Sequence, residues 1–340
     1  MPDAVTALLD RGAPIPVEHW RALWDTVEAG GLDGPHSSAL LASLATELPG
    51  DETLAALLGS LRERRPAEPT WPDTVNVVGT GGGPKTFNVS TAAAFVAAAA
   101  GVQVVKTGSR AYTSSLGSVD LLERLGVRPS ATPARTEQTL ERFGIAFAGG
   151  YVYPPVLARL ARAVMPMGMK SFGRFLNALG PFMAALPVAA QVTGVSATMP
   201  QERLRRLAAT VTDRRIWLCT NGVGADELLP FTDNTVHTPD GPVELARGSL
   251  VGGDGSLDDL APVAPQDAPA HFAAVLAGRA GPVALRTVCL NAAALAVAAG
   301  TEPDWAGAVA RAEDAVHSGA AANLLNQMRA GLRMPAVARA

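Results

Sequence analysis

From residue 75 onward, short runs of β-branched residues alternate with helical segments, and this alternation limits the folds open to the chain. Residues 75–78 form an apolar run that ends in glycines, and a helical segment follows at about 90–101. Further strands are predicted at 102–106, 145–147 and 216–220. Strands that alternate with helices build a parallel sheet covered by helices. We therefore expect a large α/β domain with a central, mostly parallel sheet.

The chain before residue 62 shows a different, helical periodicity. Its apolar residues recur at helical spacing in three groups, which predicts three short amphipathic helices separated by turns. A proline-rich segment at 65–72 reads as a linker. We expect a small helical domain over 1–66 and the α/β domain over 73–340. The helical groups are Trp20, Leu23, Trp24 and Val27, then Leu40, Leu41, Leu44 and Leu48, then Leu54, Leu57, Leu58 and Leu61.

Composition excludes several classes of protein. Of 340 residues, 48% are hydrophobic and 17% charged, with a net charge of −3, which argues against both a disordered chain and a nucleic-acid binder. Two cysteines cannot build a disulfide framework, and the five scattered histidines suggest no structural zinc site. The N-terminus lacks a signal-peptide pattern, and the uncharged stretch 89–105 is too weakly apolar for a membrane span. These features predict a cytoplasmic protein.

A glycine-rich turn follows the first strand and leads into a helix start. Glycines let several backbone N–H groups face one anion, and the helix N-terminus adds partial positive charge. The segment therefore predicts a phosphate-binding loop, although a plain glycine turn with an ordinary helix cap fits the same residues. The candidates are Gly79, Thr80, Gly81, Gly82, Gly83, Asn88, Ser90 and Thr91.

Two more predicted strands end in polar loops. Lys106 and Arg110 share a loop with four hydroxyl groups, a set that suits phosphate oxygens, or else forms an ordinary solvated loop. Asp226 and Glu227 follow the strand at 216–220 and can hold a hydrated magnesium ion, unless they are surface residues. Because ligands bind at the carboxyl ends of parallel strands, the three loops together predict a phosphate-rich ligand with magnesium. The hydroxyl groups belong to Thr113, Ser114, Ser115 and Ser118.

These motifs resemble the anthranilate phosphoribosyltransferase family. The resemblance covers 78–126, with its Gly-Thr-Gly-Gly and Asn-x-Ser-Thr elements, the Asn-Ala-Leu-Gly-Pro element at 177–181, the Asp-Glu turn at 224–227, and 278–294. It spans nearly the whole chain. It implies a fold like that of the nucleoside phosphorylases, a helical domain completed by helices within about 155–185, and a homodimer formed through that domain.

The resemblance also implies an activity and a set of site residues. The expected reaction is magnesium-dependent transfer of 5-phosphoribose from phosphoribosyl pyrophosphate to a small aromatic acceptor, with inversion and release of pyrophosphate. No residue is assigned as a catalytic acid or base. Ser90 would hold one magnesium ion, and Asp226 with Glu227 a second. The implied donor contacts are Gly79, Gly82, Thr86, Asn88, Ser90, Thr91, Lys106, Ser114 and Ser118, with Gly108 and Arg110 in the same loops.

The chain departs from the family pattern mainly where the acceptor binds. Gly83 replaces an aspartate in the glycine loop, and Ser115 with Leu116 stands where a lysine followed by serine or cysteine is common. Thr107 and Ser109 replace the family's histidine and asparagine. The family arginine that binds the anthranilate carboxylate falls on Met167 or Ala163, depending on the direction of counting, and neither binds a carboxylate.

We therefore expect an acceptor other than anthranilate, in a specialised pathway. Two alternatives remain open: true anthranilate transfer with a relocated arginine, for which Arg162, Lys170 and Arg174 are candidates, and an inactive nucleotide-binding relative. Met165, Met167 and Met169 suit an adaptable apolar surface or core packing. Phe172 and Phe175 stack on an acceptor or simply pack. The acceptor-site candidates are Gly79, Thr107, Ser109, Tyr112, Arg162, Met167, Arg174, Gly180 and Pro181.

Overall fold

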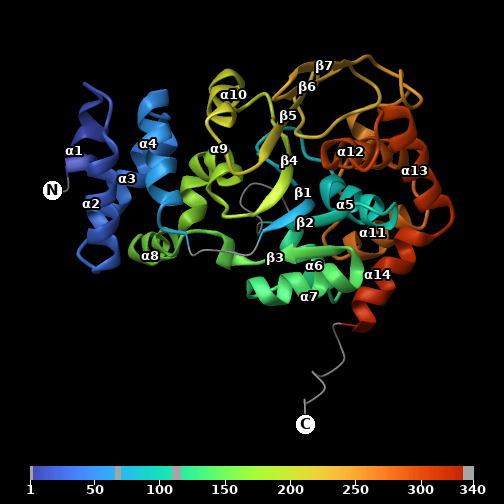
Figure 1. Cartoon of the computed structure of the whole chain (residues 1–340), viewed down its shortest axis with the longest axis horizontal. Helices are drawn as coiled ribbons and strands as arrows, with labels where there is room; N and C mark the ends of the chain where they lie inside the picture. Colours follow the sequence, from blue (N-terminus) through green and yellow to red (C-terminus); the bar gives the residue numbers. More distant parts are fainter. Residues whose placement is uncertain (1–2, 66–69, 109–115, 332–340) are drawn as a thin grey trace, which may run out of the picture. The chain divides into compact units, whose positions relative to one another are not determined.

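The computed structural model describes residues 3–65, 70–108 and 116–331, which divide into two compact units (Figure 1). The first unit is helical and comprises Met1–Glu68, Gly150–Leu186 and Met199–Thr212. The second comprises Pro69–Gly149, Pro187–Thr198 and Asp213–Ala340 and contains the sheet. The helical unit thus includes a third segment, 199–212, that the sequence analysis did not assign to it.

The helical unit has a core of its own. The three leucine- and tryptophan-rich groups form α2, α3 and α4, except that α3 ends at Thr46, before Leu48. Helix α1 precedes them. Asp33 caps α3 by accepting a hydrogen bond from the His36 N–H at 2.9 Å. Trp24 is buried and donates from its indole nitrogen to the Ser60 hydroxyl at 2.8 Å. The helices are α1 (Asp3–Asp10), α2 (Val17–Glu28), α3 (Gly34–Thr46), α4 (Asp51–Arg62), α8 (Pro155–Ala163), α9 (Gly173–Met183) and α10 (Gln201–Ala209), with 3₁₀ turns η1 (Gly150–Val152) and η2 (Met169–Phe172).

The second unit is built on a seven-stranded sheet in the order β3-β2-β1-β4-β5-β6-β7. The first five strands are parallel, as expected, and β6 and β7 add an antiparallel hairpin at one edge. The expected linker at 65–72 is wrong at its end, because Trp71 already pairs with β4 and begins β1. The strands are β1 (Trp71–Gly79), β2 (Gln103–Thr107), β3 (Ile145–Ala148), β4 (Val188–Gly194), β5 (Arg215–Asn221), β6 (Asn234–Thr238) and β7 (Gly241–Leu245).

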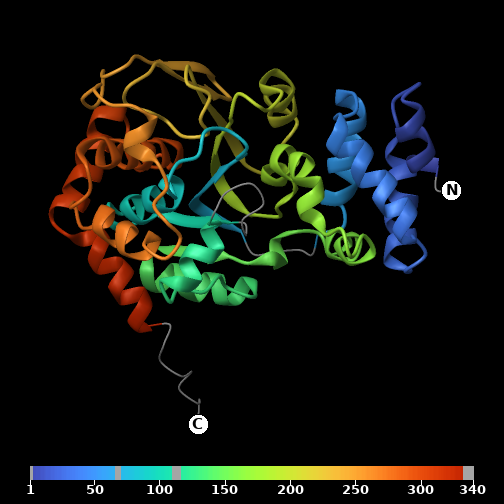
Figure 2. The same cartoon turned by 180° about the vertical axis from the view of Figure 1, so that it is seen from behind.

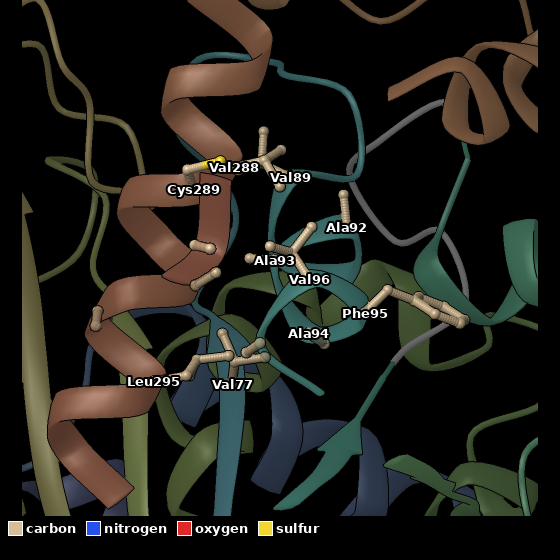
Figure 3. Packing of buried hydrophobic residues seen from close by; sticks show 14 of the residues in the cluster. Val77, Val89, Ala92, Ala93, Ala94, Phe95, Val96, Val288, Cys289 and Leu295 are labelled. Carbon is tan, nitrogen blue, oxygen red and sulfur yellow. The ribbon is translucent and has the colours of Figure 1, made fainter. Parts of the chain in front are cut away.

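Helices α5 (Val89–Ala99) and α12 (Pro282–Ala299) pack on each other and on β1 (Figure 3). Both are rich in alanine, and the small side chains let the two helix backbones approach closely. On the other side of α5, Phe95 packs against Phe147 and Phe272. Figure 2 shows the same layer from behind. The remaining elements are α6 (Ser118–Arg124), α7 (Pro133–Phe143), η3 (Leu257–Leu260), α11 (Ala268–Leu276), α13 (Trp305–His317) and α14 (Ala320–Gly331).

Among the described residues, α12 is the one helix whose length and composition would suit a membrane span. Most of the helix is buried against α5, α13 and the sheet. A core helix passes the same test of length and composition, so this feature is accounted for by packing.

Candidate active site

The carboxyl ends of β1, β2 and β5 carry the loops that hold the predicted donor and metal residues. From β1 the chain proceeds to β2 and β3 on one side of the sheet, and then to β4 and β5 on the other. The order of strands therefore reverses between β1 and β4, whose last residues, Gly79 and Gly194, are register partners. Ligands of open α/β sheets bind at such a switch point.

The glycine loop after β1 is held in one shape by the chain after β4. Gly81 and Gly82 have φ angles of +66° and +80°, which favour glycine. The backbone N–H of Ser196 donates to the Thr80 hydroxyl oxygen at 3.1 Å, and the Ser196 hydroxyl donates to the Gly81 carbonyl at 2.8 Å. A Cβ on Gly83 would lie 2.8 Å from the Gly224 carbonyl oxygen, so this position has no room for the aspartate of the family pattern unless the turn moves.

The carboxylate of Asp226 lies inside this loop. The Gly81 N–H donates to Asp226 Oδ2 at 2.7 Å. A Cβ on Gly79 would lie 2.2 Å from Asp226 Oδ2, and a Cβ on Gly194 would lie 1.7 Å from the Asp226 carbonyl oxygen. Both strand ends must therefore be glycine for Asp226 to reach its place. The bond to Gly81 also shows that the loop presents an N–H group to an anion.

Glu227 is buried beside Asp226, and one of its two carboxylate oxygens has a hydrogen-bond partner among the described residues. The Thr86 hydroxyl donates to Glu227 Oε1 at 2.7 Å, whereas Glu227 Oε2 is buried without a hydrogen-bond partner among the described residues. Burial raises the pKa of Glu227 well above its ordinary value, and the charge of Asp226 raises it further. Burial also raises the pKa of Asp226.

This pair of carboxylates fits a divalent cation. Two buried carboxyl groups in contact favour protonation unless a positive charge lies beside them, and the unpartnered Oε2 of Glu227 is a free oxygen donor. Oxygen donors are what magnesium prefers. In the described parts of the chain no group of three or more His, Cys, Asp or Glu side chains could hold a metal. A cation at Asp226 and Glu227 would thus complete its shell with hydroxyls, water or substrate oxygens.

Lys106 brings a buried positive charge to the same place. Its ammonium donates to the Val77 carbonyl at 2.9 Å and contacts the Ser90 hydroxyl at 3.4 Å. Burial lowers the pKa of Lys106 to about 8, and the nearby Asp226 partly opposes that shift. The three loops expected to surround one ligand therefore meet: Gly81 contacts Asp226, and Lys106 contacts Ser90 and feels the charge of Asp226.

The start of α5 offers further polar groups. Asn88 precedes the helix without capping it by a side-chain hydrogen bond, so its amide is not used for the helix end. Ser90 is partly exposed in the first turn. The Thr91 hydroxyl is buried and has no hydrogen-bond partner among the described residues. A helix N-terminus with unpartnered polar side chains suits an anionic group.

Thr107, which the sequence analysis places among the acceptor-site candidates, is the last residue of β2. This residue is buried, and its N–H and hydroxyl both donate to Asn76 Oδ1, at 3.0 and 3.3 Å. Its hydroxyl is therefore engaged inside the sheet and not offered to an acceptor. Next to it, Gly108 allows the chain to pass Ser118, because a Cβ there would lie 2.6 Å from the Ser118 hydroxyl. The predicted residues Ser109, Arg110, Tyr112, Thr113, Ser114 and Ser115 lie outside the described residues.

The other acceptor candidates belong to the helical unit. Arg162 is exposed in the last turn of α8, and Met167 follows with 56% of its surface exposed. Arg174 in α9 is exposed and donates to the Thr46 carbonyl at 3.3 Å. Gly180 and Pro181 lie in the last turn of α9.

Two open questions of packing are also answered in this unit. Met165 and Met167 are exposed, so core packing does not describe them, whereas Phe172 and Phe175 are buried and pack inside the unit.

A small cavity of about 90 Å³ in the helical unit borders Arg174. Apolar side chains, two arginines and the acidic Glu47 line it, so a carboxylate bound there would meet charges of both signs. Its lining includes Leu44, Leu48, Arg174, Ala178, Met199 and Arg203. Arg203 is already bonded to Leu48 and Asp51, so Arg174 is the more available of the two cations.

Sequence reasoning missed several residues that shape the site. Gly194 is the last residue of β4, a strand that was not predicted, and Ser196 follows it. Asn76 lies inside a predicted strand, where nothing in the sequence marks its role. Asn221 directly follows the strand predicted at 216–220, and Asn291 lies in the family motif at 278–294, but neither residue was assigned a role. Their roles depend on contacts between distant segments, which spacing along the chain does not reveal.

Comparison with known proteins defines the class first. The family described as "Glycosyl transferase family, a/b domain" matches residues 71–322. Anthranilate phosphoribosyltransferase of Methylorubrum extorquens (strain PA1) is 32% identical over 336 residues, covering 95% of this chain and 96% of the relative. The chain is therefore a transferase of the glycosyltransferase type, and more narrowly it belongs to the anthranilate phosphoribosyltransferase family.

Solved structures agree with this assignment. The anthranilate phosphoribosyltransferase of Thermus thermophilus superposes with a TM-score of 0.80 at 31% identity, over 98% of this chain and 100% of that one. The Saccharomyces cerevisiae enzyme, solved in complex with phosphoribosyl pyrophosphate and Mg, has a TM-score of 0.74 over 93% and 92% of the two chains. At 19% identity this second likeness concerns the fold alone.

Proposed function

We propose that this phosphoribosyltransferase moves 5-phosphoribose from phosphoribosyl pyrophosphate to anthranilate and releases pyrophosphate. The relatives at about one-third identity, all named for anthranilate, favour this acceptor over the different one expected from the sequence. The observation that carries the donor half is the meeting of the glycine loop, Lys106 and the Asp226–Glu227 pair at the switch point between β1 and β4.

In this proposal the chain stabilises the leaving group and needs no strong base. Charge grows on the pyrophosphate oxygens as the bond to the sugar breaks, and preorganised donors aimed at that charge lower the barrier. The Lys106 ammonium and the start of α5 are such donors, whereas the Gly81 N–H is already bonded to Asp226. Asp226 and Glu227 would hold one magnesium ion and Ser90 a second, and bound magnesium neutralises the diphosphate.

Arg174 is the proposed partner of the anthranilate carboxylate. It is exposed, it borders a cavity lined by apolar and charged side chains, and it lies three residues before Asn177 of the Asn-Ala-Leu-Gly-Pro element. Arg162 is the competing candidate because it lies in the last turn of α8, near the segment where the family arginine is expected. An arginine matters for this contact because, without it, the anthranilate carboxylate would lack a charge-assisted hydrogen bond.

The test is turnover of anthranilate with phosphoribosyl pyrophosphate and magnesium, followed by the loss of anthranilate fluorescence and by pyrophosphate release. Arg174→Ala should raise the KM for anthranilate roughly tenfold to a hundredfold, the range of one charged hydrogen bond, and leave the KM for the donor unchanged. Arg162→Ala is the matched control. If Arg162→Ala gives the loss and Arg174→Ala does not, the assignment passes to Arg162.

A second candidate acceptor is another small aromatic compound. The observation that favours it is the rebuilt acceptor loop, where Thr107 turns its hydroxyl to Asn76 instead of outward. A panel of aromatic amines, acids and phenols, read by pyrophosphate release, distinguishes the two. Pyrophosphate release with a compound of the panel but not with anthranilate would overturn anthranilate as the acceptor. It would leave phosphoribosyl pyrophosphate as the donor.

We also propose that the protein acts as a homodimer through its helical unit. Leu9, Met165 and Met167 of that unit are among the few large apolar side chains exposed in the described residues, which suits an apolar contact between copies. Analytical ultracentrifugation gives the mass in solution. A monomer at micromolar concentration would exclude this assembly.

A further inference from the structure

The turn that carries Asp226 and Glu227 is organised by one side chain at the end of β5. Asn221 Oδ1 accepts from the backbone N–H groups of Val223, Gly224 and Ala225, at 3.0, 2.8 and 3.3 Å. Its amide nitrogen donates to the carbonyls of Ala225 and Glu227, at 2.9 and 2.7 Å. A single asparagine thus satisfies five backbone groups of the turn.

A second asparagine forms hydrogen bonds with the backbone directly after the turn. Asn291, on α12, accepts from the Leu228 N–H at 3.0 Å and donates to the Leu228 carbonyl at 2.8 Å. It also donates to the Thr287 carbonyl of its own helix at 2.8 Å. Asn291 therefore anchors the metal-site turn to a helix that is packed into the hydrophobic core.

The two asparagines meet at one peptide bond. The peptide between Glu227 and Leu228 has its carbonyl held by Asn221 and its N–H held by Asn291. In an extended chain the side chains of adjacent residues point to opposite faces. Two neighbouring carboxylates therefore reach the same site only if the backbone around them is held in a conformation that is not extended. Asp226 and Glu227 do contact each other through their side chains.

We propose that Asn221 and Asn291 are positioning residues that fix this carboxylate pair for the magnesium ion used with the donor. The inference rests on the proposed function and deepens its metal site. It also gives a role to the motif at 278–294, which contains Asn291 and had no function assigned. Mutation of residues that orient metal ligands without coordinating the metal typically changes metal affinity by about 10- to 100-fold.

The experiment measures donor binding without an acceptor, so that no turnover occurs. Phosphoribosyl pyrophosphate is titrated calorimetrically into wild type, Asn291→Ala and Asn221→Ser at a series of magnesium concentrations. We expect the magnesium concentration for half-maximal donor binding to rise about tenfold in both variants, with donor affinity at saturating magnesium close to wild type. Circular dichroism checks that each variant is folded, and Asn221→Ser, which keeps one acceptor oxygen, serves if Asn291→Ala does not fold.

Ser60→Ala is the matched control. It removes the buried hydrogen bond to Trp24 in the helical unit, so it lowers stability without touching the metal turn. Its magnesium midpoint should equal that of wild type. If the control shifts the midpoint as much as the asparagine variants do, or if those variants keep the wild-type midpoint, the positioning role is overturned and the donor site stands. If wild type binds no donor at any magnesium concentration, the proposed function falls and this inference with it.

Discussion

The Gly81 N–H donates to the carboxylate of Asp226 at 2.7 Å, and this bond joins two loops 145 residues apart in the sequence. It ties the predicted anion-binding loop to the predicted metal pair. A rearrangement of either loop therefore changes the other. The close approach at Gly79 and Gly194 makes this coupling steric as well as electrostatic.

Gly79→Ala tests the steric part. The new methyl group would lie 2.2 Å from Asp226 Oδ2, and the movable part is the Asp226 side chain, so the chain should fold with that carboxylate displaced. We expect the KM for magnesium to rise about tenfold. Gly59→Ala is the control, because nothing lies within 4 Å of its Cβ inside α4 and alanine favours a helix by about 0.5–1 kcal/mol. Equal magnesium dependence in both variants would contradict the coupling.

Glu227→Gln should stabilise the metal-free protein at neutral and alkaline pH. A carboxyl whose pKa is raised by burial keeps its proton in the folded state after the unfolded chain has lost it. Wild-type stability therefore falls as pH rises from about 4.5, the ordinary value, through the raised pKa, whereas glutamine is neutral throughout. In chelator at pH 8 we expect a Tm higher by roughly 2–4 °C, corresponding to about 1 kcal/mol, with the difference vanishing near pH 4.5. Calorimetric scans across that pH range measure both Tm values. Equal Tm values for wild type and Glu227→Gln at pH 8 would contradict a raised pKa of Glu227.

Lys106 should make donor binding weaken as pH rises above about 8. Its pKa is lowered to about 8 by burial, so the ammonium that faces Ser90 loses its charge there. Lys106→Met should weaken donor binding by roughly 10- to 100-fold at pH 7 and abolish the decline above pH 8. Because the wild-type charge is unfavourable when buried, this variant should be no less stable than wild type below pH 8. A decline above pH 8 that persists in Lys106→Met would assign the titration to another group.

Asn76→Leu tests the buried polar chain that holds the turn after β2. Asn76 accepts two hydrogen bonds from Thr107 and donates to Gln191 Oε1 at 3.0 Å, and the Arg214 guanidinium donates to the same oxygen at 3.1 Å. Leucine leaves the buried Thr107 N–H without that acceptor, which costs about 1–3 kcal/mol. Urea unfolding measures the loss. The donor KM should rise as well, since Lys106 precedes the released turn, and a stability loss with unchanged KM would separate the two roles.

The elements predicted from periodicity correspond closely to the structure where the signal is local. The β-branched run at 75–78 lies inside β1, and the predicted strand at 145–147 lies inside β3. Two features were out of reach. β4 has two alanines and a buried Gln191 where β-branched residues are expected. β6 has one apolar residue in five and β7 begins with Gly-Pro, so both resemble loops in composition. The strand order is set by long-range pairing, which no single-strand pattern encodes.

The site divides in the same way. Glycine loops, lysine and adjacent acids are visible as residue types at strand ends, so the meeting of these three loops was predictable. The direction of the Thr107 hydroxyl depends on Asn76 from the neighbouring strand, a contact that the sequence around Thr107 does not reveal. Asn221 and Asn291 were invisible as functional residues because an asparagine reveals its role only through the backbone groups that it meets after folding.

The helical unit is assembled from three stretches of chain that end near residues 68, 186 and 212. During synthesis α1 to α4 emerge first, yet α3 packs on α9, α2 on α8 and α4 on α10. Most of the sheet strands are made before the last of these helices leaves the ribosome. No single cut of the polypeptide releases either unit whole, so fragments that end after residue 68 should expose apolar helix faces and depend on chaperones.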